Sequence, residues 1–329
     1  ASVRELLQQG AVLLVQAFGA GAQAALIPRL EGLLQRQPGP GEDAGAFDRR
    51  YQSTVVLLGT LAAHLRADDP SLLRVLELLL RTLKVPSEPV QRAVADCLVP
   101  LVAALKGTEA ADRTVRRLMD AMLQGASYGE RRGAAFGLSS AVKGLGAPSL
   151  KQFGIVPALR ESLSAGSVAQ RQGALFGCEC LSRRLGLLFE PYTISIVDAL
   201  LENFAHSSEH VRAAAENAVR VIMTGLSAHG VKQLLAPVLA TLDSEATQWK
   251  SRAEALKMLG AMAHCAPKQL AACLPQIVPP LAQASNHAHP KVRDAAKTSL
   301  AEISAVVKNP EVQQLAPALL AALADPANK

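Results

Sequence analysis

The sequence of 329 residues predicts an all-α solenoid of about eight helix-pair repeats, and three observations carry this prediction. First, an arginine recurs along the chain at spacings of 39, 40, 41, 40 and 41 residues. Second, each of these arginines is followed three positions later by alanine, and seven and ten positions later by a small or apolar residue, which traces one helical face. Third, no stretch alternates with the period of two that marks a strand. The recurring residues are Arg92, Arg131, Arg171, Arg212, Arg252 and Arg293.

A second helix per repeat is expected in the segments between these arginine helices. Apolar residues at three- and four-residue spacing predict helices over residues 153–163, 192–204, 231–242 and 270–281. Two helices within a period near 40 residues are typical of HEAT and armadillo repeats. Each repeat of such an array buries its apolar face by stacking on the next one, and the invariant alanine lets the helices approach closely.

The N-terminal part of the chain follows the same pattern less closely. Residues 50–66 and 3–18 read as looser copies of the repeat, and residues 37–48 read as an exposed Gly/Pro loop. We therefore predict HEAT-like repeats over residues 1–110 and more regular HEAT repeats over 111–329, forming one continuous solenoid.

Composition excludes several classes of protein. Half of the residues are hydrophobic, which excludes a disordered chain, and 3% are aromatic, which argues against a surface that stacks single-stranded bases. Residues 6–28 carry no charge, but their glutamines and glycines favour a buried helix over a membrane span. The odd number of scattered cysteines predicts reduced, buried thiols in an intracellular protein. The chain does not begin with Met, so we expect a piece of a longer protein.

No catalytic or metal-binding constellation emerges from the sequence, so we expect neither an enzyme nor a cofactor. His287 and His289 could reach one metal ion, but a solvated loop explains them better. Cys178 and Cys180 point to different faces of a helix, and core packing is the better interpretation of Cys178. Gly129, Gly133 and Gly137 follow no strand, so they predict a close-packed helix face, which Gly173 and Gly177 repeat, and not a phosphate-binding loop.

Two sets of basic residues have both a structural and a functional interpretation. The six repeat arginines could form a binding ladder, but their register with the core favours bonds to carbonyls or acids of the adjacent turn. Cations also recur where the second helix of a repeat ends, which the helix dipole favours and which a ridge that binds phosphate groups of RNA would also need. The cations of this candidate ridge are Lys106, Lys143, Arg183, Arg184, Lys268 and Lys308, with Lys232 on an intervening loop.

Particular sequence words resemble a known family. They are dense over about residues 125–329 and thinner over residues 1–110. The words are YGERRGAAFGLSSAVKGLG (128–146), GALFGCECLSRRLGLLFEPY (173–192), LSAHGVKQLLAPVLATL (226–242), WKSRAEALKMLGAMAHCAPKQLAACLPQIVPPL (249–281) and KNPEVQQLAPALLAALADP (308–326). They resemble the large HEAT-repeat translational activators of the general-control, amino-acid starvation pathway, and this stretch resembles their central region, related to the HEAT domain of fungal elongation factor three.

The resemblance implies a ribosome-associated, cytosolic scaffold that senses stalled or colliding ribosomes and promotes activation of the initiation-factor-two alpha kinase. It implies the ribosome as a partner, the kinase through the full-length protein and an ABC-type ATPase as a further candidate, with no membrane and no DNA partner. The segment that holds the kinase's RWD domain is expected beyond Lys329. The alternative is another HEAT scaffold, such as a tubulin-binding TOG array or a transport receptor. TOG arrays usually present Trp and Lys side chains on their turns, and this sequence has one such pair, Trp249–Lys250, which weakens the TOG interpretation.

Overall fold

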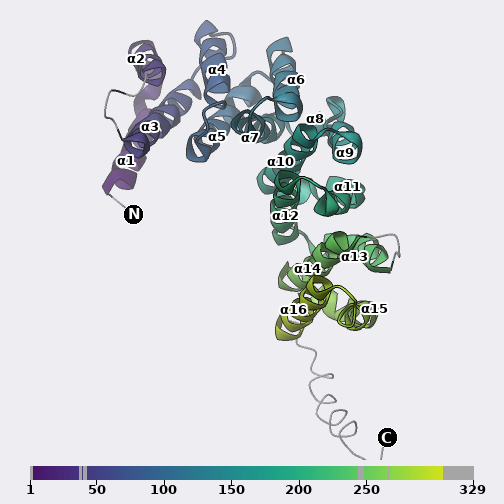
Figure 1. Ribbon diagram of the computed structural model, residues 1–329. Coiled ribbons are helices and arrows are strands. Elements are labelled where there is room, and N and C mark those ends of the chain that lie inside the picture. Colours follow the sequence, from purple (N-terminus) through teal and green to yellow (C-terminus); the bar gives the residue numbers. More distant parts are fainter. Residues whose placement is uncertain (1–2, 37–38, 40–42, 244–247, 266, 307–329) are drawn as a thin grey trace, which may run out of the picture. The chain divides into compact units, whose positions relative to one another are not determined.

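The computed structural model describes residues 3–36, 39, 43–243, 248–265 and 267–306. In this part of the chain sixteen α-helices and three short 3-10 helices follow one another, and no strand occurs (Figure 1). The predicted all-α class is confirmed. The chain divides into two compact units, residues 1–185 and 186–329. The domain boundary predicted at 110/111 falls inside the first unit, and it stays a prediction about family resemblance.

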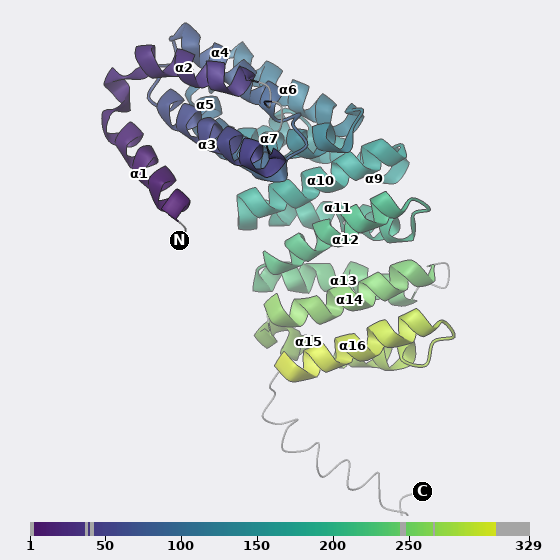
Figure 2. The same ribbon diagram turned by 60° about the vertical axis from the view of Figure 1, so that its left-hand side comes forward.

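The first unit contains an unpaired N-terminal helix and four helix pairs. In each pair the second helix packs against the second helix of the next pair: α3 against α5, α5 against α7, and α7 against α10 (Figure 2). The elements are α1 (Val3–Phe18), η1 (Gly19–Gly21), α2 (Gln23–Gln35), α3 (Ala44–Ala62), α4 (Pro70–Thr82), α5 (Glu88–Ala104), α6 (Glu109–Gln124), α7 (Tyr128–Leu145), α8 (Pro148–Gln152), α9 (Ile155–Ala165) and α10 (Val168–Leu185).

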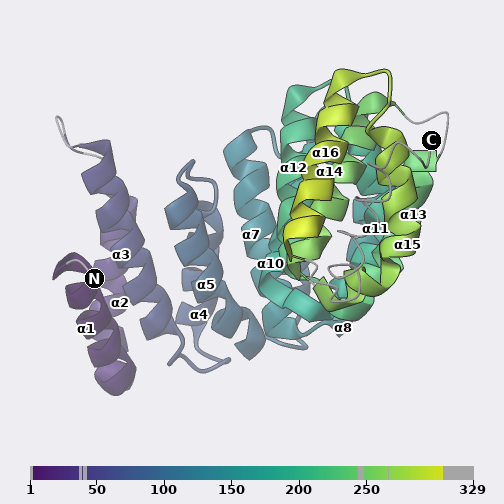
Figure 3. The ribbon, with the colours of Figure 1, turned by 90° about the horizontal axis from the view of Figure 1, so that it is seen from below.

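The described residues of the second unit form three helix pairs in two layers. One layer holds the second helices α12, α14 and α16, and the other holds α11, α13 and α15 (Figure 3). The elements are η2 (Gly186–Leu188), α11 (Glu190–Glu202), η3 (Asn203–Ala205), α12 (Glu209–Thr224), α13 (Ala228–Asp243), α14 (Trp249–Cys265), α15 (Pro267–Ala284) and α16 (Pro290–Val306).

Small residues set the spacing of the second helices, as the sequence predicts. All six repeat alanines are buried, with at most 3% of their surface exposed: Ala95, Ala134, Ala174, Ala215, Ala255 and Ala296. The close-packed glycine face is also confirmed. A Cβ at Gly133 would overlap the carbonyl oxygen of Leu83, and one at Gly173 would overlap that of Met122. Because backbone presses on backbone at these two points, only glycine fits there.

Side-chain caps explain where several second helices begin. Ser127 Oγ accepts from the backbone N–H of Glu130 at 3.1 Å, and the Glu130 carboxylate accepts from Ala126 at 3.2 Å. Ser167 and Gln170 form the same reciprocal pair before α10, at 3.4 and 2.8 Å. Each pair satisfies two backbone donors that helix geometry leaves open, so the turn into α7 and into α10 is fixed locally.

The N-terminal helices α1 and α3 differ from the sequence-based expectation in two ways. Helix α3 begins at Ala44, inside the predicted loop 37–48, because Asp43 accepts from Ala46 N–H at 2.8 Å and caps the helix. The predicted buried helix over residues 6–28 is wrong: the turn Gly19–Gly21 divides it, and α1 exposes Leu7, Leu13 and Phe18 by 64 to 72% of their surface. No helix in the described residues has the length and apolarity that a membrane crossing requires.

Candidate interaction surfaces

Four of the six repeat arginines donate to the turn that precedes their own helix. Arg131 Nη1 donates to the Gly125 carbonyl at 2.7 Å, and Arg171 Nε donates to that of Gly166 at 2.9 Å. Arg212 reaches the carbonyls of His206 and Ser207 at 2.8 and 2.7 Å, and Arg293 reaches those of His287 and Ala288 at 2.9 and 2.8 Å. These guanidinium groups satisfy carbonyls at the start of the second helix, which ties the turn to the helix.

The other two repeat arginines have different partners. Arg92 donates to the Glu88 carboxylate at 3.0 Å from Nε, and its guanidinium lies 5.6 Å from the centre of the Phe136 ring. Arg252 Nη1 lies 3.1 Å from Nε2 of His287, in the turn before α16. All six arginines therefore make contacts within the chain, and those contacts match a structural function better than a free binding ladder.

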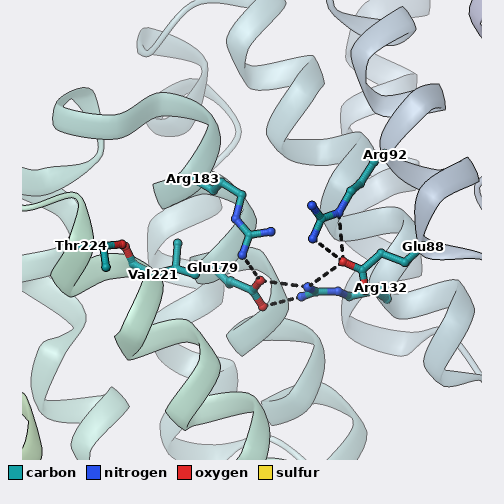
Figure 4. A network of polar contacts seen from close by, with 7 residues as sticks. All are labelled: Glu88, Arg92, Arg132, Glu179, Arg183, Val221 and Thr224. Atoms are coloured by element: carbon teal, nitrogen blue, oxygen red, sulfur yellow. Dashed lines mark hydrogen bonds and ion pairs between the residues drawn. The ribbon is translucent and has the colours of Figure 1, made fainter. Parts of the chain in front are cut away.

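A buried ion-pair network lies between α5, α7 and α10 in the first unit (Figure 4). Arg132 donates to both Glu179 oxygens at 2.5 and 2.9 Å, and the side chains are 8% and 5% exposed. Glu179 also pairs with Arg183 at 2.9 Å, and Arg132 lies 3.8 Å from Glu88. The sequence analysis missed this network. Its one sequence signal is a charged residue, Glu179, between the apolar positions Cys178 and Cys180.

Aromatic rings complete the surroundings of Arg132. Its guanidinium lies 4.8 Å from the centre of the Phe136 ring and 5.0 Å from that of Phe176. Burial by itself would lower the pKa of the Arg132 guanidinium, but hydrogen bonds to Glu179 and the negative charge of that group outweigh it and raise the pKa above the ordinary arginine value. The Arg132 guanidinium is therefore charged in the folded protein, and removing the Glu179 carboxylate would leave it as a buried charge without its main partner.

The predicted basic ridge is only partly available to a partner. Lys143 is exposed in the last turn of α7, and no acidic group of the described residues pairs with it. Arg183 pairs with Glu179, and Arg184 donates to Asp96 on α5 at 2.6 Å. Lys232 does not lie on a loop: it is exposed within α13, because that helix begins at Ala228. Lys268 lies in α15, and Lys308 lies outside the described residues.

An aromatic and basic cluster borders a groove in the second unit. Trp249 at the start of α14 stacks on His289 with 3.9 Å between ring centres and 11° between planes. The Nζ atoms of Lys250 and Lys291 lie 5.8 and 5.5 Å from the centre of one Trp249 ring. The groove, of about 780 Å³, is lined along α14 and α16 by residues of both charges. The signal for this cluster in the sequence analysis was the Trp249–Lys250 pair alone.

In the described part of the chain, burial shifts the pKa of three cysteines and one histidine. No three His, Cys, Asp or Glu side chains there could hold one metal ion. The His287 ring faces the Arg252 guanidinium, and burial together with that positive charge lowers the pKa of His287. Burial raises the pKa of the Cys97, Cys178 and Cys180 thiols to about 12, so they are protonated at neutral pH.

Comparison with known proteins identifies the family. A family model described as "EF3 N-terminal HEAT repeat" matches residues 131–300, about half of the chain. The chain belongs to this family. It is 42% identical over 328 residues to "Stalled ribosome sensor GCN1" of Homo sapiens, covering 99% of this chain. It is 34% identical over 326 residues to "eIF-2-alpha kinase activator GCN1" of Saccharomyces cerevisiae, covering 98% of this chain. The predicted resemblance to the translational activators is confirmed.

The same comparisons set the scale of this match. The chain spans 12% of the length of each of these two relatives, so it corresponds to one segment of them. "Elongation factor 3" of Gonapodya prolifera is 24% identical over 214 residues, which confirms the predicted relation to that factor. Among solved structures, Kap121p bound to Nup53p superposes with a TM-score of 0.59 at 13% identity, covering 98% of this chain and 34% of that one. This likeness shows the HEAT-type fold alone.

Proposed function

We propose that this chain is a ribosome-associated scaffold segment of a translational activator that senses stalled or colliding ribosomes and promotes activation of the initiation-factor-two alpha kinase. The observation that carries the proposal is identity of 34 to 42% over nearly the whole chain to relatives named as stalled ribosome sensors and kinase activators. The proposal places the segment in the cytosol on ribosomes and leaves the kinase contact to other parts of the full-length protein. An ABC-type ATPase stays a further candidate partner.

The chemistry of the first unit supports a scaffold and not an enzyme. Its strongest polar cluster, Arg132 with Glu179, is buried and has its charges paired internally. Burial keeps its Cys97, Cys178 and Cys180 thiols protonated, Arg131 and Arg171 are bound to neighbouring turns, and Arg92 is paired with Glu88. Such groups hold a surface in shape and leave partner binding to side chains that stay exposed.

The exposed cations at the ends of second helices are our proposed contact with ribosomal RNA. Gly129 of α7 faces Pro86, and Gly144 of α7 faces Val99 and Ala103 of α5, so α5 and α7 run in the same direction. Lys106 follows the end of α5, and Lys143 lies in the last turn of α7, so both occupy one edge of the first unit. Both side chains are exposed, and neither has an ion-pair partner in the described residues. Arg183 and Arg184 contribute less, since acidic partners already compensate their charges.

Sedimentation of the chain with purified ribosomes at increasing salt tests this proposal. The double substitution Lys106→Glu and Lys143→Glu should weaken association and reduce the slope of log K against log salt by roughly two, about one for each lost phosphate contact. The matched control is Arg116→Glu with Arg160→Glu, which changes the net charge equally on the exposed faces of α6 and α9. Equal loss in both pairs would show a net-charge effect. Unchanged association of the first pair would place the ribosome contact elsewhere, and no association of the parent chain would refute the function itself.

A further inference from the structure

The groove between α14 and α16 has a basic end whose two ammonium groups form no ion pair with the described residues. Lys250 and Lys291 project from the first turns of the two helices, and both ammonium groups lie within 6 Å of the centre of a Trp249 ring. Neither lysine has a carboxylate oxygen within 4.0 Å among the residues described, whereas Lys257 of the same groove pairs with Glu254. Two like charges held beside one ring produce a positive potential that favours an anionic group.

The opposite end of the same groove is acidic. Glu302 lies about three turns after Lys291 on the same face of α16. It has no ion-pair partner in the described residues. A Cβ at position 260 would overlap the Glu302 carboxylate, so glycine at this place on α14 makes room for it in the groove. The glycine thus keeps a carboxylate between the two helices where a side chain would otherwise fill the space.

The length of the groove follows from helix geometry. Lys291 and Glu302 are eleven residues apart on α16, which corresponds to about 16 Å at 1.5 Å per residue. An extended chain covers this distance in about five residues. The groove therefore fits a ligand whose negative and positive groups are separated by about five residues.

The mixed charge of the lining distinguishes a protein ligand from a nucleic acid. Four carboxylates line the groove together with its lysines: Glu216, Glu254, Asp294 and Glu302. A phosphate backbone carries negative charge along its whole length, so it would meet these carboxylates as well as the cations of the groove. A polypeptide can place an acidic side chain at the lysines and a basic one at Glu302.

We propose that this groove binds an extended segment of a partner protein, with acidic residues at the Trp249, Lys250 and Lys291 end and a basic residue at Glu302. This inference goes beyond ribosome association and does not rest on it. Trp249 is the single tryptophan of the sequence, so its fluorescence reports directly on the basic end of the groove.

Fluorescence titration of the chain with synthetic peptides tests the proposal. The probes are the acetylated, amidated peptides DDSGSSKK and its reverse, KKSSGSDD, which lack aromatic residues and place the charges about five residues apart. One of the two orders should change Trp249 fluorescence saturably. The substitutions Lys250→Glu with Lys291→Glu, and separately Glu302→Lys, should each weaken that binding by about tenfold or more. Lys297→Glu, an exposed position on α16 outside the groove, should leave it within about twofold.

Three results would overturn the proposal. The first is the absence of a saturable change with either peptide while circular dichroism shows the helical content of the parent. The second is equal binding of the short peptide DDKK, which lacks the spacing. The third is preferential binding of a uridine hexanucleotide, which would assign the groove to nucleic acid. Ribosome sedimentation of the same Lys250→Glu, Lys291→Glu variant separates this groove from the proposed function, because that association should persist.

Discussion

The two units use the same repeat register to different ends. In the first unit the second helices α7 and α10 have glycine two positions after the repeat arginine. In the same unit, Arg132 and Arg183 both form ion pairs with Glu179. In the second unit α12 and α16 have alanine at the corresponding position, and Lys250, Lys291 and Glu302 line a groove without ion-pair partners in the described residues. Repeats with the same sequence register can thus pair their charged side chains with one another in one unit and leave charged side chains without ion pairs in another.

The largest loss of stability is expected when the Arg132–Glu179 ion pair of the first unit is broken. Glu179→Gln keeps the side-chain volume but leaves the Arg132 charge buried without its main anion, so the free energy of unfolding should fall by about 3–5 kcal/mol. Urea denaturation followed by circular dichroism measures it. The control is Glu88→Gln, whose parent side chain is 42% exposed and should cost no more than about 1 kcal/mol. Equal, small losses in both variants would mean that the buried pair contributes nothing beyond an exposed one.

The glycine contacts of the first unit give the next largest effect. Gly133→Ala places a methyl group on the Leu83 carbonyl, and because that atom belongs to the backbone it cannot rotate away. Overpacking of this kind should lower the free energy of unfolding by about 1–3 kcal/mol or more. Gly32→Ala, inside α2 with no atom within 4 Å of the new methyl group, should instead stabilise by up to about 1 kcal/mol. A Gly133→Ala protein as stable as the parent would show that α7 can move away from α4 at little cost.

The sequence predicts the fold well because the repeat itself encodes the neighbours. An arginine and an alanine at a fixed offset mark the second helices α5, α7, α10, α12, α14 and α16, and residues one period apart lie on adjacent helices. The six alanines could be assigned to the core for this reason. Trp249 and His289 are 40 residues apart, so the same rule predicts that their rings are neighbours. The repeat period does not predict how much of the two rings is exposed to solvent.

The interaction surfaces were harder to predict because they depend on which charges find partners. Arg132 pairs with Glu179, 47 residues away, which is about two helical turns past its counterpart in the next repeat. No periodicity selects that partner over others. Arg184 likewise bonds to Asp96 at a separation of 88 residues, skipping one repeat. Helix-end cations that look equivalent in sequence therefore differ in how much charge they still offer to a partner.

The packing of the repeat alanines can be tested in the second unit by comparing a buried and an exposed alanine of α12. Ala215 is fully buried on α12, so Ala215→Leu should cost about 1–3 kcal/mol by overpacking. Ala213 lies two residues earlier on the same helix and is exposed, so Ala213→Leu should change stability by no more than about 0.5 kcal/mol. Thermal denaturation of both variants measures the difference. Coincident melting curves would mean that the repeat alanine is not at a helix contact, and that the second unit tolerates spacing changes that the first does not.

The smallest effect concerns a partly exposed ion pair at the start of α7. Glu130 bonds to the Lys84 ammonium group at 2.8 Å, and this hydrogen bond is the main cause that lowers the pKa of the Glu130 carboxyl below its ordinary value of 4.5. A lowered pKa means that the folded state favours the charged form, so this stabilisation is present above about pH 4.5 and is lost as the pH falls through the folded-state pKa.

Because Lys84 is 59% exposed, solvent screens the pair, and Glu130→Gln should cost less than about 1 kcal/mol at pH 7. Glutamine can still accept from the Ala126 N–H, so the helix cap is retained and the charge alone is tested. Urea midpoints of parent and variant should differ at pH 7 and converge as the pH falls below 4.5, whereas Glu161→Gln on exposed α9 should follow the parent at every pH. A difference that stays constant down to low pH would mean that the capping hydrogen bond, and not the charge of Glu130, stabilises this turn.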